Sequence, residues 1–232
     1  MEITVNDLTK RFGSKTAADI PHLRISDGEI VGLVGNNGAG KTTLFRLMLD
    51  LLKPDTGCVT IGGIDVSRSE DWKETTGAYL DESFLIDYLT PEEYFTFICK
   101  MSGCPAFSEE MLTPFARFMN GEILGQRKFI RNLSAGNKQK VGIIAAMLSR
   151  PRTLLLDEPF NFLDPTSQSV LGNIILRYRE ETGATVLISS HNLMHTVDIS
   201  TRIMLMEHGL IIRDFPGGGS EAKAELEAYF GV

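Results

Sequence analysis

Short apolar runs along the chain predict strands near both of its ends and in its middle. The run IVGLV (30–34) is apolar at nearly every position, as a strand buried on both faces would be. Strand-like runs also occur in ITVNDLTKRF (3–12), TLLLDEP (153–159), ATVLISSH (184–191) and RIMLMEHGLIIRDF (202–215). These segments are too short for long helices, so we interpret them as strands of one or more sheets.

Turn residues predict how the N-terminal strands connect. Asp27-Gly28 lies inside PHLRISDGEIVGLVG (21–35) and is a dipeptide typical of a β-hairpin. The segment TGCVTIGGIDV (56–66) predicts another strand pair. The N-terminal region is therefore expected to contain antiparallel strands.

The apolar period changes to that of a helix after residue 40. Leu44, Leu47, Met48 and Leu51 recur at i, i+3, i+4 and i+7, and Pro54 is expected to end this helix.

The stretch 83–150 carries mostly helical patterns. Thr90-Pro91-Glu92-Glu93 predicts a capping box with proline at the first helical position. Ser108-Glu109-Glu110 predicts a second helix start by the same logic. Since strands flank this stretch, we interpret it as a helical segment inserted into an α/β domain with a mostly parallel sheet covered on both faces.

The chain ends with a predicted helix after a flexible joint. PGGGS (216–220) precedes EAKAELEAYF, whose apolar positions would dock on the rest of the domain. Those positions are Ala222, Leu226, Tyr229 and Phe230.

Composition narrows the class of protein. The 232 residues carry a net charge of −7 and lack the basic footprint of a nucleic-acid-binding protein. No apolar run approaches the roughly 20 residues of a membrane span, and the first residues show no basic-then-apolar targeting region. A cytoplasmic protein is expected. Cys58, Cys99 and Cys104 lack metal-site spacing, so we expect buried or idle thiols.

The segment GNNGAGKTT (35–43) predicts a phosphate-binding loop. It matches G-x-x-x-x-G-K-[ST] between a predicted strand and a predicted helix. Its glycines let the backbone turn N–H groups inward, and the helix that begins at Lys41 directs its positive dipole end at the phosphates. Lys41 adds charge near the β and γ phosphates, and the Thr42 hydroxyl is an oxygen ligand suited to Mg²⁺.

Two strand ends predict further chemistry. Asp157 and Glu158 follow a buried-type strand, at the sheet edge where ligands bind in open α/β folds. Asp157 would hold magnesium, and Glu158 would orient or deprotonate an attacking water. His191 ends another strand and would donate to the γ-phosphate.

Together with LSAGNKQK (133–140), these motifs resemble the ATP-binding-cassette (ABC) ATPases, the nucleotide-binding subunits of ABC transporters, over nearly the whole chain. The resemblance implies a single P-loop NTPase domain over residues 1–232. Its parts would be an N-terminal antiparallel β part, a mostly parallel sheet, a helical subdomain at about 83–150 and a C-terminal helix at about 221–231. It implies that ATP binds at Phe12, which would stack on adenine, and at Gly35, Asn36, Asn37, Gly38, Ala39, Gly40, Lys41, Thr42 and Thr43.

The resemblance also implies that two subunits pair head to tail. LSAGNKQK corresponds to the family signature, a second helix N-terminus suited to an anion. Ser134, Ala135 and Gly136 would contact the ATP of the partner copy in trans. Asp164, in the D-loop NFLD (161–164), would lie at the same seam. Loss of the γ-phosphate would open the pair.

The sequence departs from the usual residues of the family's motifs at three positions. Ala135 stands where glycine is usual, and Asn137 where glutamine is usual. Glu82 stands at the Q-loop position, where it would offer an oxygen to Mg²⁺ beside Thr42 and Asp157; the other interpretation is a simple loop acid. The overall motif pattern most resembles that of bacterial export-type or multidrug-type cassettes. The aromatic-rich segment 83–97 either receives a helix of the membrane subunit or packs the helical part itself.

The leading hypothesis is thus an ATPase subunit, in a homodimer or heterodimer of cassettes, on the inner face of the cell membrane with a separately encoded transmembrane permease. The alternative is a non-transport ABC ATPase acting on ribosomes or DNA. Such proteins usually carry two cassettes or a long coiled coil, and the acidic charge disfavours nucleic acid. A small-molecule P-loop kinase would explain neither LSAGNKQK nor His191.

Overall fold

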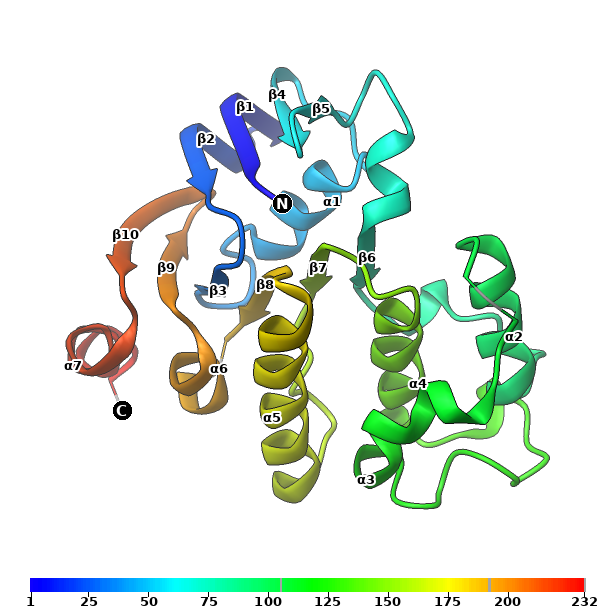
Figure 1. The fold of residues 1–232 in the computed structure, drawn as a ribbon. Coiled ribbons are helices and arrows are strands. Elements are labelled where there is room, and N and C mark those ends of the chain that lie inside the picture. The colour runs from blue at the N-terminus through cyan, green and yellow to red at the C-terminus, as the bar shows by residue number, and fades with distance from the viewer. Residues whose placement is uncertain (105, 192, 232) are drawn as a thin grey trace.

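The computed structural model describes residues 1–104, 106–191 and 193–231, and its strands form two sheets (Figure 1). The larger sheet has six strands in the order β10-β9-β3-β8-β7-β6, and all but β10 run parallel to their neighbours. These strands are β3 (Ile30–Val34), β6 (Thr76–Tyr79), β7 (Thr153–Leu156), β8 (Thr185–Ser190), β9 (Arg202–Glu207) and β10 (Leu210–Pro216).

The smaller sheet is antiparallel and comes from the N-terminal region. Its four strands have the order β2-β1-β4-β5. They are β1 (Ile3–Phe12), β2 (Lys15–Ile25), β4 (Thr56–Ile61) and β5 (Ile64–Asp65). The expected α/β fold with an N-terminal antiparallel part is confirmed.

Seven α-helices are described in the residues that the structure covers. They are α1 (Lys41–Met48), α2 (Pro91–Met101), α3 (Ala116–Met119), α4 (Ala135–Leu148), α5 (Pro165–Thr182), α6 (Leu193–Ile199) and α7 (Gly219–Phe230). Short 3₁₀ turns lie at η1 (Asp71–Thr75), η2 (Glu82–Phe84), η3 (Glu109–Phe115) and η4 (Ile130–Asn132). The predicted capping box of α2 is present, since Thr90 and Glu93 each bond the other's backbone N–H.

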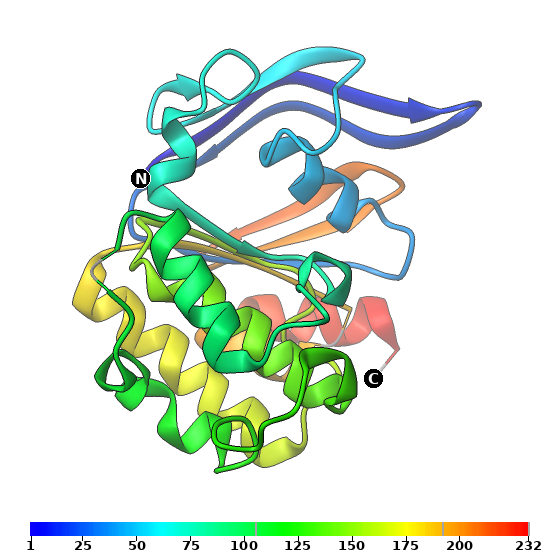
Figure 2. The same ribbon diagram turned by 90° about the vertical axis from the view of Figure 1, so that its right-hand side faces the viewer.

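Helix α1 lies between the two sheets (Figure 2). Its Leu44, Phe45 and Leu47 pack in one cluster with strands of the antiparallel sheet and with one face of the parallel sheet. Helices α2, α4 and α5 cover the opposite face in a second cluster. Strands β3, β7, β8 and β9 therefore have two apolar faces, which explains their unbroken apolar runs. Along β7, Leu155 faces α1, whereas Leu154 and Leu156 face α4 and α5.

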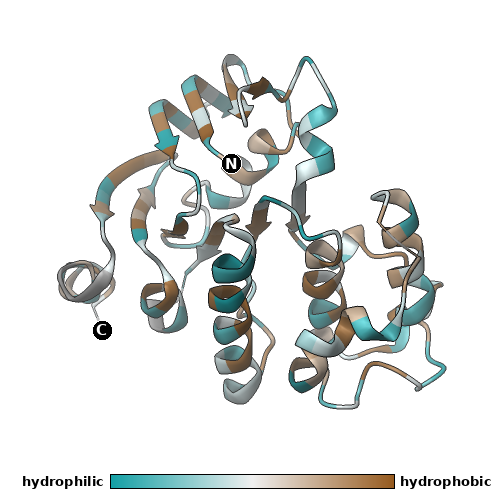
Figure 3. Cartoon of the chain, in the orientation of Figure 1, coloured by the Kyte–Doolittle hydropathy of each residue, from teal (hydrophilic) through white to brown (hydrophobic). Residues whose placement is uncertain are grey.

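Hydropathy follows this layering. In Figure 3, hydrophilic and hydrophobic residues alternate along α5, as expected for a helix with one face on the sheet. The expected docking of the C-terminal helix is confirmed, because Ala222, Leu226, Tyr229 and Phe230 of α7 pack in a third cluster with β3, β9 and α6. Cys58, Cys99 and Cys104 are free thiols.

The predicted hairpin at Asp27-Gly28 is wrong. The hairpin closes instead between Phe12 and Lys15, where Gly13 takes a left-handed φ of 59°. Gly28 also has a positive φ, but β2 and β3 on either side of it belong to different sheets. The turn dipeptide thus transfers the chain from one layer to the other, a choice that local sequence does not encode.

Two predicted helix features are also wrong. The helix after the glycine-rich loop ends at Met48, because Asp50 adopts a left-handed φ of 52°, and Leu51 is 52% exposed rather than on the buried face. Ser108 makes no side-chain cap bond, and a 3₁₀ helix follows it. Pro114 lies inside that helix and lacks the N–H that an α-helix needs.

Over the described residues, none of the helices combines the length and the apolar character needed to cross a membrane.

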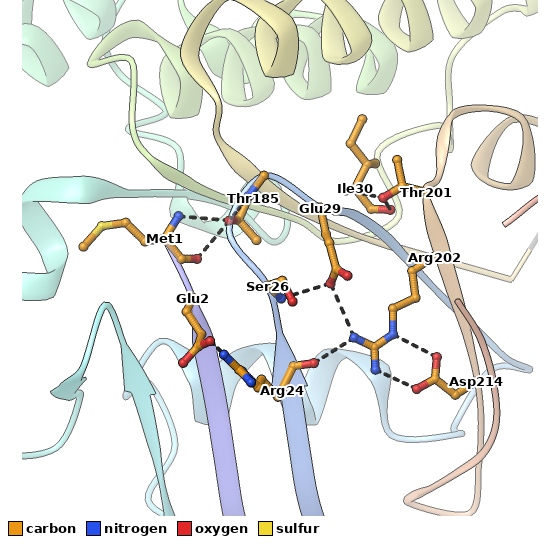
Figure 4. A network of polar contacts seen from close by, with 11 residues as sticks. Met1, Glu2, Arg24, Ser26, Glu29, Ile30, Thr185, Thr201, Arg202 and Asp214 are labelled. Atoms are coloured by element: carbon orange, nitrogen blue, oxygen red, sulfur yellow. Dashed lines mark hydrogen bonds and ion pairs between the residues drawn. The ribbon is translucent and has the colours of Figure 1, made fainter. Parts of the chain in front are cut away.

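Arg202 joins four strands at the edge of the parallel sheet that lies opposite the glycine-rich loop (Figure 4). Its guanidinium donates to both oxygens of Asp214 on β10, at 2.8 and 2.6 Å, and to the carbonyl of Arg24 on β2 at 2.7 Å. It also lies 3.4 Å from Glu29, just before β3. Its side chain is only 15% exposed, so these contacts are poorly screened by water.

We predict that Arg202→Met lowers the free energy of unfolding by about 2 kcal/mol or more, because Asp214 and Glu29 lose their cation and the Arg24 carbonyl loses its donor. Urea unfolding measures the change. Arg213→Met is the matched control, since the Arg213–Glu225 pair is at least half exposed and is expected to cost less than about 1 kcal/mol. Equal losses in the two variants would contradict the role assigned to Arg202.

Candidate active site

The glycine-rich loop at residues 35–43 follows β3, and its last three residues begin α1. Gly38 and Gly40 have φ values of 83° and 114°, which favour glycine. A Cβ on Gly40 would lie 2.3 Å from the Ala17 carbonyl oxygen, and one on Gly35 would lie 2.2 Å from the Met206 carbonyl oxygen. These glycines are therefore required by backbone angle and by close approach.

Lys41 is the first residue of α1 and is only 5% exposed. Its Nζ donates to the Gly35 and Asn36 carbonyl oxygens at 2.6 and 3.3 Å. It also lies 3.3 Å from Oε1 of Glu158. A buried ammonium needs such partners, because an unpaired charge in the interior is costly.

Asp157 and Glu158 follow β7, as the sequence predicts. Asp157 is buried and accepts a hydrogen bond from the Ser189 hydroxyl on β8. Burial raises the pKa of the Asp157 carboxyl above its ordinary value, although hydrogen bonds from Ser189 and Thr42 act to lower it. The Thr42 hydroxyl and the Asp157 carboxylate thus lie together.

Glu158 is held from three sides. Its backbone has a left-handed φ of 49°, uncommon for a residue other than glycine. Its N–H donates to Ser189 Oγ at 2.9 Å. Its Oε2 lies 2.8 Å from Nδ1 of His191 and accepts from the His191 backbone N–H at 3.2 Å. The contact between Glu158 and His191 was not predicted, because it joins the ends of two strands distant in sequence.

Two adjoining hollows surround these groups. One, of about 270 Å³, is lined by Phe12, by residues 37–43 and by Glu158. The other, of about 460 Å³, shares Thr42 and Glu158 with the first and extends to Glu82 and Ala135. Phe12 is 54% exposed at the rim, where Lys10 Nζ lies 5.7 Å from its ring centre.

Ser134 caps α4, as the sequence predicts. Its hydroxyl accepts from the Asn137 N–H at 3.2 Å, and Ala135 begins the helix. Ser134 and Ala135 are exposed, so the first turn of α4 presents backbone N–H groups to solvent. Behind them, Gly136 lies against the Phe162 carbonyl oxygen, which would be 2.7 Å from an added Cβ.

The two remaining candidates make contacts within the chain. Oε2 of Glu82, in η2, lies 3.2 Å from Nζ of Lys138 on α4, a partner that sequence reasoning missed. Asp164 caps α5 by accepting from the N–H and the hydroxyl of Ser167, at 3.0 and 2.6 Å. These hydrogen bonds lower the pKa of Asp164.

Comparison with known proteins identifies the surrounding fold. A family model described as ABC transporter matches residues 19–161. The chain is 32% identical over 219 residues to the bacitracin transport ATP-binding protein BcrA of Enterococcus faecalis, covering 91% of this chain and 68% of that protein. It is 29% identical over 214 residues to a probable sulfate/thiosulfate import ATP-binding protein, CysA, of Chlorella vulgaris, covering 92% of this chain and 90% of that one.

A solved structure shares the fold and adds an assembly. It is a dimeric ATP-binding cassette in a post-hydrolysis state, bound to ADP and Pi, with a TM-score of 0.80 and 25% identity. The match covers 94% of this chain and all of that chain.

We predict that Gly136→Ala lowers the free energy of unfolding by about 1–3 kcal/mol, because its Cβ would press on a backbone oxygen that no side-chain rotation can relieve. Thermal unfolding measures the loss. Gly172→Ala, also in a helix, is the control: its Cβ would lie 3.4 Å from a methyl group of Ile199, and alanine favours the helix. A loss as large in Gly172→Ala would contradict the importance of the Gly136 contact.

Proposed function

Because the chain belongs to the ABC transporter family and is an ATP-binding and ATP-hydrolysing subunit, we propose that its 35–43 loop, Glu158 and His191 carry out the hydrolysis that powers a membrane transporter. The observation that carries this assignment is the meeting of Lys41, Glu158 and His191. Lys41 begins α1, Glu158 follows β7 and His191 follows β8. Lys41 contacts one oxygen of the Glu158 carboxylate and His191 contacts the other.

The roles of these groups follow from those contacts. ATP phosphates accept from the loop N–H groups, and Lys41 donates to the β and γ phosphates instead of to Glu158. Oε1 of Glu158 then becomes free to accept a proton from the attacking water, while His191 holds Oε2. The water oxygen bonds to the γ phosphorus as the bond to the β-phosphate oxygen breaks, giving ADP and phosphate.

The residues present suit Mg²⁺. Thr42 and Asp157 offer hard oxygen ligands side by side, and bound Mg²⁺ neutralises phosphate charge. Within the described part of the chain, no three His, Cys, Asp or Glu side chains gather as a metal cluster. We assign Thr42 and Asp157 as the core of the metal site because their oxygens lie together, and the metal role of Glu82 stays a prediction.

Pairing of two copies completes the site. The first turn of α4 is exposed, and a helix N-terminus suits an anion, yet Ser134 does not line the hollow beside the 35–43 loop. We assign Ser134, Ala135 and Gly136 to the γ-phosphate of a partner copy, either identical or a second cassette, with Asp164 near the seam. The dimeric relative supports this arrangement.

The aromatic-rich segment divides into buried and exposed side chains. Leu85, Tyr94 and Phe95 are buried in the cluster around α4, whereas Phe84 and Tyr88 are 51% and 69% exposed. We assign the exposed group to a separate transmembrane permease, which places the chain on the inner face of the membrane. Relatives of similar identity are named for bacitracin transport and for sulfate/thiosulfate import, so we assign cargo and direction to that permease. The export-type resemblance stays a prediction.

Glu158→Gln is expected to bind ATP, to hydrolyse it on the order of 10²–10³-fold more slowly, and to accumulate as an ATP-bound dimer, because the amide cannot take the proton. Phosphate release and light scattering with Mg-ATP measure the two effects. Glu110→Gln, an exposed glutamate away from the site, is the control. Unchanged turnover in Glu158→Gln would remove Glu158 from its assigned role.

Ser134→Arg is expected to leave ATP binding by a single copy intact. It is expected to prevent dimer formation, because the long arginine side chain would fill the space at the exposed turn of α4 where the partner copy docks. Binding of a fluorescent ATP analogue and light scattering separate the two. Ser108→Arg, at an exposed serine without a cap bond, is the control. Lost binding in the monomer, or full hydrolysis by copies that do not pair, would contradict the assignment in trans.

A further inference from the structure

The segment from Glu158 to Asp164 is held in an unfavourable backbone conformation. Glu158 and Phe162 both have left-handed φ values, 49° and 57°. Such angles persist in residues other than glycine only where surrounding contacts impose them. The contacts that hold this segment therefore decide where the Glu158 carboxylate points.

Two glutamines from different helices hold successive carbonyls of the segment. Gln139 on α4 donates to the Pro159 carbonyl oxygen and, at 3.4 Å, to that of Glu158. Gln168 on α5 donates to the Phe160 carbonyl oxygen at 2.9 Å. The first glutamine belongs to the signature motif, whereas nothing in the motifs points to the second.

The Gln168 amide also reaches a third helix. Because its NH₂ group donates to Phe160, its Oε1 is turned toward α6, where it lies 3.0 Å from Nε2 of His195. A carbonyl oxygen needs a donor, so this contact requires the proton to be on Nε2 of His195. The imidazole also packs on the Phe160 ring, with the ring centres 5.5 Å apart.

These contacts connect the segment that begins at Glu158 with the segment that begins at His191 at two places. His191 precedes α6 and contacts the Glu158 side chain directly. Four residues later, His195 contacts Gln168, which holds the carbonyl two residues after Glu158. The segments that carry Glu158 and His191 are thus joined twice, once at the carboxylate and once through Gln168.

We propose that Gln168 and His195 are positioning residues for ATP hydrolysis: their hydrogen-bonded pair fixes the segment after Glu158 to the helix after His191. This inference rests on the proposed roles of Glu158 and His191. Neither Gln168 nor His195 lines the hollow beside the 35–43 loop, so the pair acts on kcat and leaves the KM for ATP in place.

Gln168→Glu tests the pair with an isosteric change. The carboxylate keeps an acceptor for His195 but loses the donor to Phe160 O, so kcat is expected to fall about tenfold or more, as displaced catalytic groups predict. KM for ATP and the melting temperature are expected to stay near those of the unaltered protein. Gln126→Glu is the matched control, since Gln126 also donates from Nε2 to a backbone carbonyl, that of Gly121 at 3.1 Å.

His195 supplies a second, independent variant pair. His195→Leu removes the donor and is expected to lower kcat like Gln168→Glu, whereas His195→Gln restores an amide donor and is expected to recover most of the rate. Unchanged kcat in Gln168→Glu, or equal losses in the two His195 variants, would overturn the proposal. Full hydrolysis by Glu158→Gln would instead overturn the proposed function on which it rests, so the two failures are distinguishable.

Discussion

The ion pair between the buried Lys41 ammonium and Glu158 is the interaction on which the site depends. Lys41 is almost fully enclosed, and an isolated charge there would be strongly destabilising. The glycine-rich loop supplies carbonyl oxygens, and β7 supplies the carboxylate, so the loop, the helix and the strand end must come together for the charge to be tolerated. The same three elements surround the hollow that we assign to ATP. The cost of burying the lysine thus enforces the geometry of the site before any nucleotide arrives.

The layered fold makes that meeting possible. Helix α1 is enclosed between the antiparallel sheet and the parallel sheet, while α4 and α5 cover the far face. The ends of β3, β7 and β8 consequently open at one edge, where residues far apart in sequence converge. Arg202 closes the other edge with contacts to two carboxylates and a carbonyl. The amino ends of the parallel strands are therefore stabilised by paired charges, and their carboxyl ends are left for binding.

Features with a local cause could be predicted from the sequence. The loop at 35–43, the cap at Ser134 and the box at Thr90–Glu93 depend on residues within a few positions of one another, and the structure has all three. The hairpin at Asp27-Gly28 was wrong because the choice of sheet is tertiary. Pairs such as Glu82–Lys138 and Glu158–His191 escaped prediction for the same reason: their partners lie more than 30 residues apart.

The N-terminal part of α4 carries both the cap residue Ser134 and Gln139, which contacts the segment after Glu158. Its exposed first turn presents Ser134, with N–H groups suited to a phosphate, whereas Gln139, five residues on, fixes the Pro159 carbonyl beside Glu158. A rigid helix cannot move one without the other, and Gly136 packed on Phe162 leaves little slack between them. On the proposed role of Ser134, an anion that draws the first turn toward a partner copy would also pull on the segment that carries the local glutamate. Under the proposed assignments, contact in trans at Ser134 and water activation in cis at Glu158 would thus be mechanically joined over less than two turns of helix.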